Sequence, residues 1–467
     1  MANLGYPFTL GVASGEPLPD GVVIWTRLAP EPLGRDPARP GGMPDRIVPV
    51  GWQVAEDEGF RRIVRQGTAR ADRRWAHSVH VRVDGLNPGS DYFYRFSVGA
   101  PFAATTSPAG RTRTAPAAGA VTPVRFAFVS CQRYEHGHFT ALRHLADERP
   151  DAVLQLGDYV YEYGRPAAPG PGRYVRRLEA PEEECRTLQQ YRNRYARYRT
   201  DPDLQAAHRA APWIATWDDH EVRDNYRGAL PGDGSDPAAF RRRRAAAYQA
   251  YYEHLPLRVR PSASGLQMHR WRPYGRAADF LVLDVRQHRT AASMLGGAQE
   301  EWLLARLAGS AARWKVLVQP LFFSRRFVPG PPPNLRADAW DGYPEFRRRV
   351  TGAGVRGLVV VSGDVHNAWA GELRADFADP ASPPAGVEFV GSSVTSMPPA
   401  TDSAAVLAAN PHLRFFDGRR GYVVCTAGVD GFHAAYRAVD FVDRPGSPVR
   451  TAAGFAVRDD RLVPDAV

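Results

Sequence analysis

The chain has 467 residues, enough for about three average domains or for one large and one small domain. Its hydrophobic fraction of 44% and charged fraction of 24% exclude a disordered chain, and no run of about 18 apolar residues predicts a transmembrane helix. The formal net charge is +10, but 59 of the 60 basic residues are arginines, so we read the charge as a general arginine bias and expect no nucleic acid as a stable partner.

The first 115 residues predict an all-β module. Strand-like runs separated by turn residues are Phe8–Ala13, Val22–Leu28, Val48–Ala55, Arg62–Ala69, Ser78–Val83 and Tyr92–Val98. The segment from Leu86 to Tyr92 resembles the tyrosine corner of fibronectin type III domains, in which a tyrosine hydroxyl bonds back to the backbone. We therefore expect a small β-sandwich over residues 1–115, with no chemistry of its own.

A change of pattern follows residues 116–123, whose alanine, proline and glycine content is typical of a linker. The strand Val124–Val129, helical spacing from Phe139 to Ala146 and the strand Ala152–Leu156 predict a β-α-β unit. Further strands are predicted at Trp213–Thr216, Phe280–Leu283, Lys315–Val318, Leu358–Val361 and Glu388–Val390, and further helices at Arg241–His254 and Gln299–Leu307. This alternation favours an α/β catalytic domain over residues 124–467.

Several of these apolar strands end at side chains that can bind metals. Cys131 follows the first strand of the β-α-β unit and Asp158 follows the second. Asp218–Glu221 come after the next strand, and Asp364 and His366 follow the strand that ends at residue 361. Ligands of open α/β sheets collect outside the carboxyl ends of strands. We therefore expect these clusters to converge although they are far apart in sequence.

The individual clusters differ in what they indicate. Cys131 alone is compatible with core packing, a nucleophile or a metal ligand. The three acids and one histidine of Asp218–Glu221 repel one another unless a cation lies among them. Asp364 and His366 are two residues apart, so an extended backbone directs both to one side. Tyr161 offers a phenolate, a hard ligand that a ferric ion can hold deprotonated.

Together the motifs resemble those of the calcineurin-like metallophosphoesterases. The particular residues within them are similar to those of the PhoD-like alkaline phosphatases, also called phospholipase D-type phosphodiesterases. The main motifs that carry the resemblance are Ser130–Cys131, Gly157–Glu162, Asp218–Glu221 and Gly363–His366. Secondary matches are Gly11–Pro17, Leu283–Gln287 and Trp340–Pro344. The resemblance covers nearly the whole chain. It implies an α/β fold with a metallophosphoesterase-type two-sheet sandwich flanked by helices, preceded by a fibronectin type III-like domain.

The resemblance also implies a metal set. A ferric ion (Fe3+) would be held by Cys131, Asp158, Tyr161 and His366. Asp158 would bridge to one or two divalent ions, which we expect to be Ca2+ because Asp219 and Asp364 provide an oxygen-rich shell. Gln319 stands where other metallophosphoesterases have a histidine. Its side chain is therefore expected either to provide an oxygen ligand to the metal or to support a ligand without touching the metal.

The implied reaction is metal-dependent hydrolysis of phosphomonoesters, phosphodiesters or both, as in an alkaline phosphatase. His220 would protonate the leaving alkoxide or donate a hydrogen bond to it. Arg286 and Asn225 are expected to contact the phosphate. One alternative is a phospholipase D-type phosphodiesterase that acts on phospholipid or teichoic acid-like diesters, and a distant alternative is a non-catalytic binding module.

Partners and location follow from the same resemblance. We expect a monomer that takes a small-molecule phosphate ester or a phospholipid as substrate, with transient contact to a membrane surface in the second case. The resemblance implies that the protein is secreted, to an extracellular or periplasmic location. No export signal precedes the sequence that begins at Leu4, so we expect that export is absent or that the signal peptide has been removed.

Overall fold

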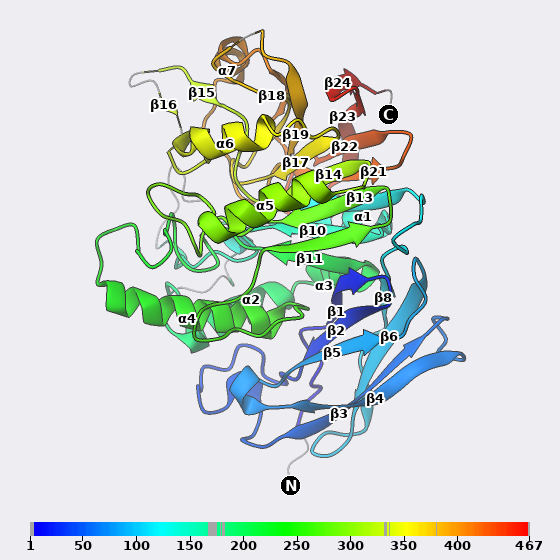
Figure 1. Ribbon diagram of the computed structural model, residues 1–467. Coiled ribbons are helices and arrows are strands. Elements are labelled where there is room, and N and C mark those ends of the chain that lie inside the picture. Colours follow the sequence, from blue (N-terminus) through cyan, green and yellow to red (C-terminus); the bar gives the residue numbers. More distant parts are fainter. Residues whose placement is uncertain are drawn as a thin grey trace.

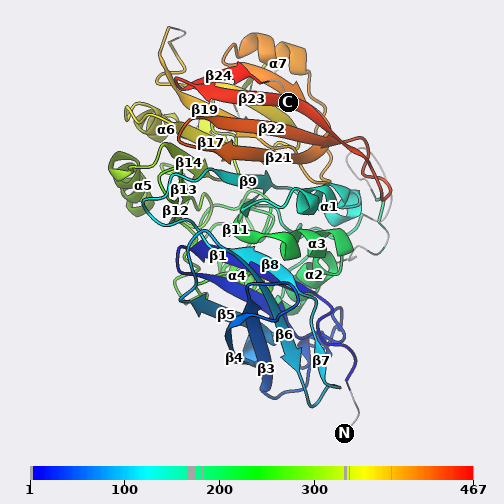
Figure 2. The ribbon, with the colours of Figure 1, turned by 90° about the vertical axis from the view of Figure 1, so that its right-hand side faces the viewer.

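Two large β-sheets pack face to face, and helices cover their outer sides (Figure 1). The computed structural model describes residues 4–166, 175–177, 179, 183–330, 334–335, 337–379 and 381–465. The helices over the first sheet are α1 (Thr140–Asp147), α2 (Leu188–Arg199), α3 (Pro202–Ala210) and α4 (Pro237–His254). Those over the second are α5 (Gly297–Gly309) and α6 (Pro344–Thr351). Figure 2 shows α5 and α6 at one side of the molecule and α1 and α3 at the other.

The first sheet has ten strands in the order β24-β23-β22-β21-β9-β10-β11-β1-β2-β5. In chain order these are β1 (Val12–Leu18), β2 (Gly21–Arg27), β5 (Ser78–Asp84), β9 (Val124–Val129), β10 (Ala152–Leu156), β11 (Pro212–Thr216), β21 (Arg420–Ala427), β22 (Phe432–Val439), β23 (Val449–Arg458) and β24 (Arg461–Pro464). Four adjacent strands of this sheet, β9, β10, β11 and β1, run parallel to one another, so their carboxyl ends lie at the same end of the sheet.

The second sheet has seven strands in the order β12-β13-β14-β17-β19-β18-β20. They are β12 (Arg270–Tyr274), β13 (Ala278–Val282), β14 (Trp314–Val318), β17 (Leu358–Ser362), β18 (Ala368–Arg374), β19 (Pro384–Val390) and β20 (Leu413–Asp417). Between the sheets lies a core to which both contribute, including Phe126, Phe280 and Phe389. Burial of this apolar surface holds the two layers together.

A smaller five-stranded sheet covers the N-terminal part of the first sheet. Its members are β3 (Val48–Ala55), β4 (Ile63–Ala71), β6 (Asp91–Val98), β7 (Thr105–Thr106) and β8 (Gly110–Arg113). It packs against β1, β2 and β5 over a shared apolar core. The hydroxyl of Tyr92 accepts a hydrogen bond from the backbone N–H of Asn87 at 2.9 Å, which is the contact that the sequence predicted for a tyrosine corner.

The N-terminal strands are thus part of the large sheet, because β1 pairs with β11 in parallel. Glu16 of β1 also links the two large sheets: its buried carboxylate accepts hydrogen bonds from Arg270 and Arg272 of β12, in the second sheet. The segment 116–123, predicted as a linker, packs against the turn after β12, where Arg276 donates its backbone N–H to the carbonyl of Ala120 at 2.7 Å. The division of the chain at this segment stays a prediction.

Local sequence signals explain where the helices begin. Thr187 and Gln190 form a capping box at the start of α2. Asp201 and Asp236 each accept two backbone hydrogen bonds from the first turns of α3 and α4, and each is followed by a proline, which favours the first helical position. The predicted helix over Arg241–His254 is confirmed and begins four residues earlier, because Asp236 and Pro237 supply the start signal.

Most of the predicted strands are confirmed within about two residues, but the first was placed wrongly. The run Phe8–Ala13 was predicted as a strand, whereas β1 begins at Val12. Gly11 has φ +69° and its N–H bonds to the carbonyl of Phe8 at 3.0 Å, so these residues form a turn before the strand.

The remaining elements lie beyond one edge of the second sheet. They are β15 (Phe327–Val328), β16 (Asn334–Leu335) and α7 (Ser403–Ala409), and α7 packs against β15 and β20. Short 3-10 turns cover Pro40–Gly42, Arg73–Trp75, Tyr134–His136 and Trp340–Gly342. Among the helices within the described ranges, none has the length and apolar character needed to cross a bilayer.

Candidate metal centre

The candidate ligands lie in the loops that follow the parallel strands, as predicted. Cys131 follows β9, Asp158 follows β10, and Asp364 follows β17. These three residues have φ values of 57°, 55° and 65°, and His366 has 58°, all in the left-handed region that non-glycine residues seldom adopt. Each loop therefore turns sharply at the residue that carries the functional side chain. Strained backbone of this kind clusters at functional sites.

Gly157 shows why this geometry needs a particular sequence. Its φ is +92°, and a Cβ atom at this position would lie 2.6 Å from the backbone nitrogen and from the Cβ of Asp218. Any larger residue would push the loop after β10 away from the loop after β11. Gly157 therefore allows Asp158 to approach the Asp218–Glu221 segment.

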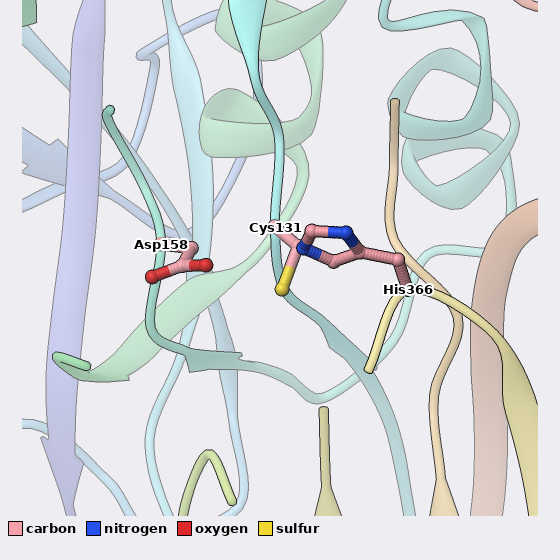
Figure 3. A group of neighbouring side chains, drawn as sticks. All are labelled: Cys131, Asp158 and His366. Atoms are coloured by element: carbon pink, nitrogen blue, oxygen red, sulfur yellow. The ribbon is translucent and has the colours of Figure 1, made fainter. Parts of the chain in front are cut away.

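The sulfur of Cys131, a carboxylate oxygen of Asp158 and a ring nitrogen of His366 all lie within 4.8 Å of one another. Figure 3 shows the Cys131 sulfur beside the imidazole ring, with the Asp158 carboxylate to one side. These residues come from three loops separated by more than two hundred positions of sequence between the first and the last. The convergence that the strand-end pattern predicted is therefore present for this cluster.

Tyr161 joins the same cluster. Its hydroxyl donates to Oδ2 of Asp158 at 2.8 Å and lies 3.1 Å from Nε2 of His366. Nδ1 of His366 lies 2.9 Å from the carbonyl oxygen of Met397, a contact that requires the proton on Nδ1 and leaves the Nε2 lone pair directed into the cluster. All four residues expected to hold a ferric ion thus lie together.

A second group shares Asp158 with the first. One ligand atom each of Asp158, Asp219 and His220 lies within 4.8 Å of the others. Asp364 contributes to the same electrostatic environment, because burial, followed by the carboxylates of Asp219 and Asp338, raises its pKa to about 6. Asp219 thus lies with Asp158, whereas Asp364 belongs to neither group of converging ligand atoms among the described residues.

The cluster is crowded with groups that resist ionisation in the absence of a cation. Burial and the nearby Asp158 carboxylate raise the pKa of the Cys131 thiol well above its usual value. Burial also raises the pKa of Asp158 and of Tyr161, and the acidic neighbours of each add to the effect. Within the described residues, Oδ1 of Asp158 is buried and accepts no hydrogen bond. A cation would serve as its partner and would favour the ionised ligands, so the residues present fit a bound metal.

His220 faces a carboxylate that the sequence reasoning left without a role. Its Nδ1 lies 2.8 Å from Oε2 of Glu162, and Oε1 of Glu162 accepts the backbone N–H of Asp224 at 2.7 Å. Burial acts against protonation of His220, but Asp219, Glu162 and Asp158 outweigh it and raise its pKa well above its usual value. Glu162 is part of the motif that includes Asp158, but that motif alone does not indicate a contact with His220.

Arg286 and Asn225 are placed differently from the other site residues. Arg286 is fully buried; its Nε donates to Asp218 at 2.6 Å and its other nitrogens donate to Asp338 at 2.9 and 3.2 Å. Asn225 is exposed, its backbone N–H donates to Asp219 at 2.7 Å, and its side chain donates to Asp224 at 3.2 Å. Both are next to the candidate ligands, but their contacts are to protein carboxylates, and phosphate contact by either one stays a prediction.

Gln319 is buried within a hydrogen-bond network. Its Oε1 accepts the backbone N–H of Leu321 and the indole N–H of Trp340, both at 3.0 Å. Its Nε2 donates to the hydroxyl of Ser362 at 2.8 Å. These contacts fix the loop after β14 against the end of β17, two residues before Asp364.

The chain is similar to known proteins over most of its length. A family model described as "PhoD-like phosphatase" matches residues 126–436, and one described as "PhoD-like phosphatase, N-terminal domain" matches residues 2–116. The chain is 46% identical to alkaline phosphatase D of Bacillus subtilis (strain 168), over 98% of this chain and 82% of the relative.

Solved structures are also similar. One titled "Structure of PhoD" superposes with a TM-score of 0.92 at 44% identity, covering all of this chain and 94% of its own. The purple acid phosphatase PPD1 from yellow lupin (Lupinus luteus) superposes with a TM-score of 0.60 at 12% identity, covering 97% of this chain and 75% of its own. The lupin enzyme is similar in fold alone.

Proposed function

The chain belongs to the PhoD-like phosphatase family, and from this premise we propose that it hydrolyses phosphate esters at a centre that combines ferric iron with calcium. As a member of this family it is a metal-dependent phosphoric ester hydrolase of the alkaline phosphatase type. The observation that carries the finer proposal is the cluster of a thiol, a carboxylate and an imidazole within 4.8 Å.

The donor set supports an iron ion and an oxygen-bound partner. Cys131, Tyr161 and His366 would supply a thiolate, a phenolate and an imidazole, a combination that suits iron better than calcium. Asp219 and Asp364 would supply carboxylate oxygens, which suit Ca2+. Asp158 contacts both groups and would bridge them. When bound, the ions would polarise the phosphoryl oxygens and lower the pKa of water, which supplies the nucleophile.

His220 would act as the proton donor. The surrounding carboxylates raise its pKa, which favours the protonated ring, and protonation of a leaving alkoxide makes its departure easier. Glu162 accepts a hydrogen bond from the Nδ1–H, which orients the ring and leaves the Nε2 proton for transfer. Arg286 would balance the negative charge of Asp218 and Asp219. Asn225 would hold Asp219 in place through the hydrogen bond from its backbone N–H.

The substrate class is a phosphomonoester, a phosphodiester or both. We further propose that the protein works as a monomer at an extracellular or periplasmic location, and that a phospholipid substrate would bring it into transient contact with a membrane surface. Phospholipid or teichoic acid-like diesters are the alternative substrates to test against small phosphate esters.

The proposal is tested by metal analysis combined with an absorption spectrum of protein purified without chelator. We expect about one iron per chain, bound calcium, and a visible charge-transfer band from thiolate or phenolate on ferric iron. Hydrolysis of p-nitrophenyl phosphate and of bis-p-nitrophenyl phosphate, with and without calcium, then separates monoester from diester preference. A protein that binds zinc in place of iron, with full activity and no visible band, would contradict the proposed centre.

A further inference from the structure

The loop that follows β19 lies against the candidate iron ligands, although the motifs found in the sequence do not include it. It covers residues 391–397, and its first six residues are buried. The backbone N–H of Val394 donates to the carbonyl of Ser130 at 3.1 Å, next to the first candidate ligand. The carbonyl of Met397 accepts a hydrogen bond from Nδ1 of His366 at 2.9 Å. This loop therefore supports the metal centre from a part of the sequence that carries no candidate ligand.

Ser396 is the residue of this loop that contacts two further ligands. It is fully buried, and its Oγ lies 2.9 Å from the hydroxyl oxygen of Tyr161 and 2.8 Å from the carbonyl oxygen of Cys131. Its Oγ also accepts the backbone N–H of Arg133 at 3.2 Å. A serine hydroxyl carries one proton, so it can donate to Tyr161 or to Cys131 but not to both. The state of these two oxygens decides which one receives the proton.

The carbonyl of Cys131 has other donors, whereas the oxygen of Tyr161 does not. The backbone N–H groups of Ser396 and Thr395 donate to this carbonyl at 3.1 and 3.4 Å. Among the described residues that are not candidate ligands, only Ser396 has a donor within hydrogen-bond distance of the Tyr161 oxygen. A phenolate accepts hydrogen bonds more strongly than a neutral carbonyl, because its oxygen is charged. When Tyr161 is a phenolate, the Ser396 proton should therefore be directed to it.

Other contacts hold Ser396 in place for this hydrogen bond. Its carbonyl accepts a hydrogen bond from Nη1 of the buried Arg420 at 3.1 Å. Its backbone N–H is held by Cys131, and its Oγ is held by the backbone N–H of Arg133. Rotation about the bond between Cβ and Oγ is then enough to turn the proton from the carbonyl to the phenolate, and neither oxygen has to move.

We propose that Ser396 is a positioning residue of the iron centre, and that its hydroxyl limits the electron density that the Tyr161 phenolate gives to the ferric ion. The inference rests on the proposed function, because it takes Tyr161 to be an iron ligand. Hydrogen bonds to the ligands of a metal tune its electronic properties. With this hydrogen bond in place, promotion of an electron from the phenolate to the iron requires more energy, and the ferric ion is more easily reduced.

Ser396→Ala removes the hydroxyl and tests this role without reference to activity. In the iron-loaded variant, the phenolate charge-transfer band should lie at a longer wavelength than in the parent protein. Spectroelectrochemical titration, in which an electrode supplies one electron to each ferric ion, should give a lower midpoint potential. At a fixed potential the ratio of ferric to ferrous iron should rise by roughly 3- to 10-fold, because part of the strength of a charge-assisted hydrogen bond is lost. Ser396→Thr keeps the hydroxyl and should restore both values.

Thr395→Val is the matched control, because it removes the neighbouring buried hydroxyl of the same loop. That hydroxyl donates to the carbonyl of Arg133 at 2.7 Å and contacts no candidate ligand among the described residues. The band and the midpoint potential should equal those of the parent protein. If Ser396→Ala does not unfold cooperatively on heating, resonance Raman spectra of the parent protein in H2O and D2O carry the test. The phenolate C–O stretching frequency should shift when deuterium replaces the Ser396 proton, and an unchanged frequency would overturn the inference.

The possible results distinguish this inference from the proposed function. A parent protein that binds no iron, or that shows no visible band, would contradict the proposed centre and the role of Ser396 with it. An iron-loaded parent protein whose band and midpoint potential are unchanged in Ser396→Ala would overturn the inference alone. An equal change in Thr395→Val would also overturn it, because the change would then come from a disturbed loop and not from the lost hydrogen bond.

Discussion

Nδ1 of His220 lies 2.8 Å from a carboxylate oxygen of Glu162; the Glu162 side chain is buried and that of His220 is partly exposed. The other oxygen of Glu162 is held by the backbone N–H of Asp224. Glu162 therefore orients the imidazole ring and favours a proton on its Nδ1. A histidine oriented in this way presents its Nε2 proton in one direction only, which is what a proton donor to a leaving group requires.

Replacement of Glu162 by Gln tests this coupling. The amide keeps the size of the side chain but removes the negative charge that stabilises protonated His220. We expect kcat to fall by about 10- to 100-fold with little change in KM, because the chemical step is affected more than binding. Steady-state kinetics with metal analysis checks this. An unchanged kcat with full metal content would show that the contact has no part in proton transfer.

His220→Asn should have a larger effect at the same step. The amide cannot donate a proton at neutral pH, so we expect kcat to fall by about 10²–10⁴-fold for a substrate with a poor leaving group. The fall should be much smaller for p-nitrophenyl phosphate, because p-nitrophenolate leaves without protonation. If the variant loses its metals, or if both substrates are affected equally, His220 acts as a ligand and its role as proton donor is contradicted.

Cys131→Ser should remove the iron but spare the fold. The hydroxyl is a weaker ligand for ferric iron than the thiolate, so we expect the visible absorption band to disappear and the iron content to fall to near zero. Cys425→Ser is the matched control, since Cys425 is a buried cysteine of β21 that lies outside the metal-binding clusters of the described residues. A Cys131 variant that keeps both the iron and the band would contradict the assigned centre.

Arg286→Met separates a structural role from phosphate contact. The guanidinium is paired with the buried carboxylate of Asp218 and with Asp338. Loss of one partner of a buried pair costs about 3–5 kcal/mol, so the free energy of unfolding of the metal-free protein should fall by that order. Urea unfolding measures it. Calcium should restore part of the loss, because a cation would replace the missing charge. A raised KM with unchanged stability would instead support the phosphate contact predicted from sequence.

Asp158 and Arg286 show which features of the candidate site can be predicted from the sequence and which cannot. Asp158 could be predicted because a buried parallel strand is a continuous apolar run, and its end marks where ligands collect. Arg286 follows a strand in the same way, but its partner Asp338 is 52 residues away. Local sequence does not specify whether an arginine at a strand end faces substrate or is enclosed by carboxylates.

The C-terminal strands β21 to β24 were not predicted, for a related reason. They are antiparallel, and β22 and β23 each contain three alanines, which have low strand propensity. Their position is decided by pairing with β9, which lies about three hundred residues earlier in the chain. Glu162 was missed because a hydrogen bond to His220 depends on two loops that meet only in the fold.

Glu16 provides a prediction about pH that does not involve the metal centre. Burial opposes its ionisation, but Arg270 and Arg272 outweigh burial and lower its pKa from 4.5 to about 2. A depressed carboxyl pKa stabilises the folded state above the unfolded pKa, and this contribution is lost as the pH falls from about 4.5 towards 2. Its full size is on the order of 3 kcal/mol at neutral pH.

Glu16→Gln should therefore lower the free energy of unfolding at pH 7 by about 3 kcal/mol and flatten its dependence on pH between about 5 and 2. Urea unfolding followed by circular dichroism at several pH values measures both effects on metal-free protein. Asp57→Asn is a suitable control, because Asp57 also pairs with an arginine but at the surface, where such a pair contributes little. If the parent protein and Glu16→Gln lose stability in parallel on acidification, the junction between β1 and β12 does not depend on the charge of Glu16.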